Sequence, residues 1–163
     1  INITIMKEFD YKLPYKELDF SNKEIRKLYR IGRGEQGVLL VRPYTDDICK
    51  HWKFKVPSIA KKSAQKIYEM YADYKAKNDF VGMDMCRKFL EMGFTRARRY
   101  ANHKDGKKYD AEGNIRPQEK DWATSKKAQS ANIFKVYRDT VAKDPKYKAM
   151  RKHWRDFENT IGV

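Results

Sequence analysis

The sequence has little cysteine, no long apolar run and far fewer acidic than basic residues. Its two cysteines, Cys49 and Cys86, are too few for the disulfide framework of a small secreted domain, and neither lies in a Cys-x-x-Cys pair. No apolar stretch approaches the ~18 residues that a membrane-spanning helix needs, and the opening residues lack a signal-peptide pattern. We therefore expect a cytoplasmic protein that has no membrane segment.

The spacings typical of common catalytic and metal sites are also missing. The three histidines, His51, His103 and His153, are far apart, and no His-Glu-x-x-His spacing occurs. The sequence therefore predicts no catalytic residue, no metal site and no cofactor.

Positive charge is what the sequence has in excess. Lys and Arg number 37 against 22 Asp and Glu, which gives a formal net charge of +15. Such a field attracts phosphates, and an aromatic content of 13% indicates a chain that folds, unlike a disordered basic tail. Length and charge together predict one domain over residues 1–163 whose partner is a polyanion.

Short apolar runs in the first third of the chain predict a small antiparallel sheet. Ile25–Ile31 and Val38–Val41 flank a glycine-containing turn, and His51–Val56 alternates apolar and basic side chains as a half-buried strand does. Residues 1–20 have scattered apolar positions and a helix-breaking Pro14, which favour an extended arm.

After the expected sheet, apolar residues recur at helical spacings. The pattern predicts one helix capped by Ser58, a second capped by Asp79 and ended by Gly93, and a short helical turn over Thr95–Tyr100.

Two further helices are expected near the end of the chain. One runs from about Ser125 to Lys143, and the other is capped by Asp144 and begins with Pro145. The apolar stripe of the last helix consists of Tyr147, Met150, Trp154 and Phe157, opposite a basic face of Lys148, Arg151, Lys152 and Arg155.

The stretch over residues 102–121 is polar and rich in turn residues, so it is expected to be a long polar loop. The fold class is therefore predicted as α+β: a small N-terminal antiparallel sheet followed by about four helices in a single domain.

Cations and aromatic side chains are interleaved after Thr95. Arginine forks grip phosphate oxygens, and tyrosine rings stack on bases. Helical spacing puts Arg96 and Arg99 on one face with Tyr100, whereas Arg98 points elsewhere and is expected to be structural. The predicted contacts to DNA or RNA are Arg96, Arg99, Tyr100, Asn102, His103, Lys104, Lys107 and Lys108. The same residues also fit a solvated helix end and its loop.

A second hypothesis centres on Gly32–Gly37. Bare glycines let backbone N–H groups approach an anion, so Gly32, Arg33, Gly34 and Gly37 are possible phosphate-binding residues. With His103 as an acid or base, this turn would hold a phosphorylated metabolite in a small enzyme or sensor. The competing interpretation is a simple hairpin turn. A third hypothesis is a basic adaptor that docks on an acidic protein.

Several long strings of the sequence resemble a known family. They are Leu28–Val41, His51–Lys55, Lys66–Met70, Asp79–Leu90 and Met92–His103, together with Trp154. In these strings the chain is similar to a family of small bacterial and tailed-phage proteins known only as a domain of unknown function. The resemblance implies a bacterial cell or a phage-infected host as the setting, and it implies no catalytic residue.

Overall fold

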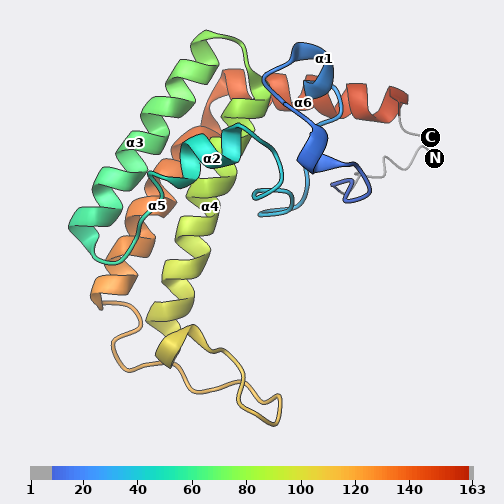
Figure 1. Cartoon of the computed structure of the whole chain (residues 1–163). Coiled ribbons are helices and arrows are strands. Elements are labelled where there is room, and N and C mark those ends of the chain that lie inside the picture. Colours follow the sequence, from blue (N-terminus) through green and yellow to red (C-terminus); the bar gives the residue numbers. More distant parts are fainter. Residues whose placement is uncertain (1–8, 162–163) are drawn as a thin grey trace, which may run out of the picture.

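The structure, a computed structural model, describes residues 9–161, and nearly all of their regular structure is helical (Figure 1). The elements in chain order are η1 (Tyr15–Glu17), α1 (Lys23–Arg26), α2 (Tyr44–Cys49), α3 (Pro57–Ala76), α4 (Phe80–Asn102), η2 (Lys104–Gly106), α5 (Lys126–Lys143) and α6 (Pro145–Ile161), where η marks 3₁₀ helices. None of these described helices is long and apolar enough to cross a membrane.

Helix α4 is the centre of the fold. It packs against α3 and α5, which also pack against each other, and α6 crosses near its beginning (Figure 1). The ring centroids of Phe80 and Trp154 are 5.4 Å apart at this crossing. The segment over residues 9–56 packs on the remaining side, because Phe9 and Phe20 are buried in the same core as Phe89.

The predicted N-terminal sheet is wrong, and with it the α+β fold class. Within residues 9–161 the only strand-like pairing is an isolated bridge between Tyr109 and Ile115. Around Tyr29 and Ile31 the backbone bonds to side chains of α6. The indole Nε1–H of Trp154 donates to the carbonyl of Tyr29 at 3.0 Å, and the N–H of Ile31 donates to Glu158 at 2.7 Å. These bonds satisfy backbone groups that a neighbouring strand would otherwise have to satisfy.

The other two expected strands fail for related reasons. Val38–Val41 folds into consecutive turns, in which the N–H of Leu40 donates to the carbonyl of Gly37 at 3.1 Å, and Leu39 is 59% exposed. His51–Val56 does place Trp52 against the core, with its ring centroid 5.9 Å from that of Phe89, but no strand lies beside it. The alternation of apolar and basic residues in this segment therefore indicated which side chains face the core, but it did not indicate a strand paired in a sheet.

The helix signals were more accurate. Asp79 caps α4 by accepting from the N–H of Gly82 at 3.1 Å, and Ser125 caps α5 by accepting from Ala128 at 3.1 Å. Asp144 accepts from the N–H of Lys146 at 3.0 Å, which confirms the cap before α6. Ser58 is not a cap, because α3 already begins at Pro57.

Gly93 does not end its helix, and Thr95–Tyr100 is not a separate turn, because α4 continues through both to Asn102. A Cβ atom at Gly93 would lie 2.5 Å from the ring of Phe134 on α5. The glycine is therefore explained by the close approach of two helices. It has no role in helix termination.

The expected arm over residues 1–20 is described only from Phe9 onwards. Phe9 and Tyr15 are buried, and their rings stack with centroids 5.2 Å apart. This part of the segment is therefore a component of the core.

Candidate nucleic-acid interface

The last turns of α4 bring three of the predicted binding residues together. Arg96, Arg99 and Tyr100 are exposed and line one pocket of about 500 Å³ with Glu35 and Gly106. The carboxylate of Glu35 accepts a hydrogen bond from the hydroxyl of Thr95. The two guanidinium groups and the phenol ring therefore border the same hollow.

Arg98 has the structural role expected of it. Its Nη1 donates to the carbonyl of Trp122 at 2.8 Å, and its Nη2 donates to Asn132 at 3.3 Å. These bonds attach the loop after α4 to helix α5.

Asn102 and His103 lie beneath that loop. His103 is 6% exposed, and the buried Nδ1 of His103 and Oδ1 of Asn102 have no hydrogen-bond partner among the described residues. The carbonyl of Asn102 accepts from the N–H of Glu119 at 2.8 Å. The His103 side chain is therefore not presented at the surface, and it lines none of the pockets described in this section.

The loop over residues 103–125 projects beyond the end of α4 and carries Lys104, Lys107 and Lys108 at exposed positions (Figure 1). Its charges cancel, because Lys104, Lys107, Lys108, Arg116 and Lys120 are matched by Asp105, Asp110, Glu112, Glu119 and Asp121. The loop therefore contributes no net positive field to a phosphate backbone.

A long run of positive charge without acids lies elsewhere in the chain. Between Asp47 and Glu69 the chain contains no acidic residue. Its cations in that interval are all exposed: Lys50, Lys53, Lys55, Lys61, Lys62 and Lys66. The alternation in His51–Val56 covers only Lys53 and Lys55 of these lysines, although the long acid-free interval is a signal in the sequence that could have identified all of them.

The fold joins this interval to the arginines of α4 through aromatic rings. The guanidinium carbon of Arg96 lies 5.5 Å from the ring centroid of Trp52. The ammonium nitrogen of Lys127, at the start of α5, lies 5.9 Å from the ring of Phe54 and 5.7 Å from that of Tyr100. We refer to Trp52, Lys53, Phe54, Lys55, Arg96, Arg99, Tyr100 and Lys127 as the basic aromatic surface.

The pKa values of two groups around this surface are lowered, first by burial and then by neighbouring cations. Burial, followed by the charge of Lys55, lowers the pKa of Lys127. The pKa of His51 is also lowered, first by burial and then by Lys66, Lys50 and Lys53. Neighbouring cations therefore disfavour one another, and a bound polyanion would relieve that repulsion.

The turn over Gly32–Gly37 is no hairpin, because no strands flank it. Gly34 has a φ of +48°, and the N–H of Gln36 donates to the carbonyl of Arg33 at 2.9 Å. Gly32, Arg33 and Gly34 line a pocket of about 490 Å³ against α6. Gly37 is separated from them: it lines another hollow, beside Leu40 and Arg96.

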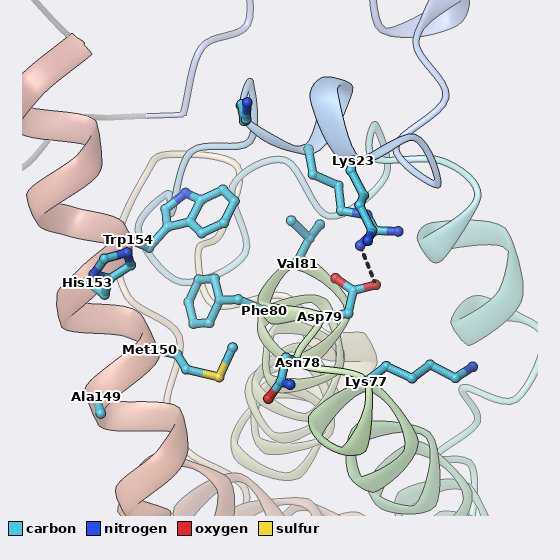
Figure 2. A pocket seen from close by; sticks show the side chains of 12 residues that line it. Lys23, Lys77, Asn78, Asp79, Phe80, Val81, Ala149, Met150, His153 and Trp154 are labelled. Atoms are coloured by element: carbon cyan, nitrogen blue, oxygen red, sulfur yellow. Dashed lines mark ion pairs between the residues drawn. The ribbon is translucent and has the colours of Figure 1, made fainter.

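The largest of the four pockets described in this section, about 720 Å³, lies between α1, the start of α4 and α6 (Figure 2). Figure 2 shows the rings of Phe80 and Trp154 on one side of it and the carboxylate of Asp79 on another. Asp79 forms an ion pair with Arg26 at 3.7 Å. The cationic rim of the pocket is formed by Lys23, Arg26, Lys27 and Lys77, and none of the residues predicted to bind a ligand lines it. Chemically, it suits a flat apolar group attached to an anion.

Within residues 9–161, no three His, Cys, Asp or Glu side chains are grouped as a metal site requires.

The comparisons with known proteins gave one match. A family model described as Domain of unknown function (DUF4385) matches residues 10–157 of the chain. The searches of curated proteins and of solved structures each found no match.

Proposed function

The chain belongs to this family of unknown function, so its activity has to be inferred from its own surface, and we propose that it binds nucleic acid through the basic aromatic surface. On this proposal, lysines and arginines contact phosphates, and aromatic rings contact bases. The recognition is mainly of the backbone, with modest sequence preference.

The observation that carries the proposal is the contact of cations with rings across three parts of the chain. Trp52 supports Arg96, and Lys127 lies over both Phe54 and Tyr100. Phe54 and Trp52 themselves pack with ring centroids 4.9 Å apart. Rings that hold cations in place reduce the side-chain entropy lost when a phosphate is bound.

Tyr100 has the geometry of a stacking residue. It is 48% exposed, it lines the same pocket as Arg99, and the ammonium of Lys127 lies 5.7 Å from its ring centroid, so about half of the side chain is accessible next to two cations. A base from a single strand would stack on this ring while its phosphates contact the cations. Duplex DNA would use the cations alone.

The other hypotheses fit the surface less well. A phosphorylated-metabolite enzyme that uses His103 loses its acid or base, since that side chain is buried beneath the loop. An adaptor for acidic proteins requires charge but gives no reason for an exposed tyrosine between cations.

The test is binding to fluorescent duplex and single-stranded DNA and RNA over a range of salt concentrations. Lys53, Lys55, Arg96, Arg99 and Lys127 are the cations of the basic aromatic surface. If each neutralises one phosphate, a plot of log affinity against log salt on duplex DNA has a slope of about −4 to −5. The Arg96→Gln, Arg99→Gln double variant should flatten the slope by about two units.

Two further variants make the test specific. Lys107→Gln, Lys108→Gln removes the same charge from the neutral loop and should leave the slope unchanged. Tyr100→Ala should weaken single-strand binding by about 1–3 kcal/mol without changing the slope. Binding that is independent of salt, or an Arg96, Arg99 double variant that binds as the parent does at every salt concentration, would contradict the proposal.

A further inference from the structure

The pocket between Gly32–Gly34 and α6 is a second concentration of positive charge. No acidic residue lines it, whereas five cations do: Arg33, Arg87, Lys148, Arg151 and Arg155. It shares no residue with the basic aromatic surface.

Two of its arginines are held by buried carboxylates. The Nε of Arg87 lies 2.9 Å from Asp84, and the Nη1 of Arg155 lies 3.0 Å from Glu158. The side chains of Asp84 and Glu158 are 0% and 1% exposed. Each of these two guanidinium groups is therefore held in place by a buried carboxylate, and neither carboxylate lines the pocket.

These carboxylates are themselves fixed by further bonds. Asp84 accepts from the hydroxyls of Tyr29 and of Tyr147, the latter at 2.7 Å, and Glu158 accepts from the N–H of Ile31 at 2.7 Å. Burial alone would raise the pKa of Asp84, but Arg87, Lys88 and the hydrogen bonds outweigh it and hold that pKa well below its ordinary value. Asp84 thus stays charged and keeps Arg87 in one orientation.

Several donors remain available on the pocket side. The terminal nitrogens of Arg87 and the side chain of Arg151 make no hydrogen bond or ion pair with the described residues. Gly34 leaves the rim open, because no heavy atom lies within 4 Å of where its Cβ would be. Positioned arginine forks next to an open glycine turn are well suited to tetrahedral oxyanions.

We propose that this pocket binds a phosphoryl group, carried as a phosphomonoester. The pocket offers no exposed ring for a nucleobase, since Tyr147 is buried and its hydroxyl is bonded to Asp84. The cations that line the pocket therefore select the phosphate group, and the remainder of the ligand extends out of the pocket into solvent. Two sources share this chemistry: the terminal phosphate of a nucleic-acid strand, and a free phosphorylated metabolite.

The experiment measures binding of inorganic phosphate and ribose 5-phosphate by calorimetry at constant ionic strength, with chloride as the reference anion. Arg151→Gln removes a partly exposed cation of the pocket and should weaken both ligands about tenfold or more. Lys152→Gln is the matched control, because this neighbouring residue is exposed on α6, does not line the pocket and pairs with Asp156 at 3.9 Å.

A second arm identifies the source of the phosphate. Oligonucleotides with a 5′-phosphate are compared with the same strands ending in a 5′-hydroxyl. A gain in affinity that requires the 5′-phosphate and is lost in Arg151→Gln identifies strand ends, whereas tight binding of ribose 5-phosphate without such a gain identifies metabolites.

The two sites can be tested separately. Arg151→Gln should leave the salt slope of 5′-hydroxyl strands unchanged, and the Arg96, Arg99 double variant should leave phosphate binding unchanged. The proposal is overturned if neither phosphate nor ribose 5-phosphate binds at millimolar concentration, or if Arg151→Gln and Lys152→Gln bind them equally.

Discussion

Replacing Asp84 by asparagine should destabilise the protein strongly, because this carboxylate is the negative centre of a buried cluster. It accepts from Tyr29, Tyr147 and Arg87, and Lys88 lies close enough to influence its pKa. Asn keeps the shape but leaves the buried Lys88 and the partly exposed Arg87 without this counter-charge. Removing one partner of a buried ion pair typically costs about 3–5 kcal/mol.

The pH dependence of this loss can be worked out from the lowered pKa. A carboxyl whose folded pKa lies below its unfolded value stabilises the fold above the unfolded pKa, and that contribution fades as the pH falls toward the folded pKa. With an unfolded pKa of about 3.9, the parent loses roughly 1 kcal/mol of this contribution between pH 7 and pH 3. The difference between parent and Asp84→Asn should therefore shrink by that amount.

Urea denaturation at both pH values measures the difference. Asp46→Asn is the matched control, since its carboxylate is 64% exposed and pairs with Arg42 at 3.3 Å on the surface. It should change the free energy of unfolding by less than about 0.5 kcal/mol. A loss below about 1 kcal/mol for Asp84→Asn, or a loss that is the same at pH 3 and pH 7, would refute the reasoning.

Two further predictions concern packing and a buried lysine. Gly93→Ala should lower the free energy of unfolding by about 1–3 kcal/mol or more in denaturant melts, because the new methyl group meets Phe134. Gly113→Ala has no atom within 4 Å of its new methyl group and should cost only the strain of its positive φ, about 1 kcal/mol. A larger loss for Gly113→Ala than for Gly93→Ala would contradict this packing. Burial lowers the pKa of Lys88 to about 8, so the unfolded chain binds more protons than the folded chain above that pH. The free energy of unfolding should therefore rise by about 2 kcal/mol between pH 7.5 and pH 9.5 in the parent, and it should not rise in Lys88→Met. If the free energy of unfolding of both proteins has the same pH dependence, Lys88 does not titrate in this range.

The helices were predictable because their signals are local. Caps such as Asp79 and Asp144 act within three residues, and the helical repeat of apolar residues is visible in the sequence itself. The sheet was mispredicted because the backbone partners of Tyr29 and Ile31 are side chains more than 120 residues away, at Trp154 and Glu158. No local pattern distinguishes such an anchored segment from a strand.

The site was predictable only in part, for a similar reason. Helical spacing correctly placed Arg96 and Arg99 beside Tyr100, but the contribution of Lys127 depends on how α5 packs. The lysines Lys104, Lys107 and Lys108 are accompanied by only one acid, Asp105, whereas the other four acids of the loop begin at Asp110. Counting charge over the whole loop would have corrected this from the sequence.

The bonds from Tyr29 and Ile31 to α6 also determine when the fold can be completed. They span 125 and 127 residues, so the early segment cannot obtain these partners until the last helix has left the ribosome. Until then Tyr29 and Ile31, both fully buried in the finished protein, have no final surface to cover them. Contacts of such long range slow folding. Until α6 has been synthesised, the exposed Tyr29 and Ile31 make the nascent chain prone to aggregation.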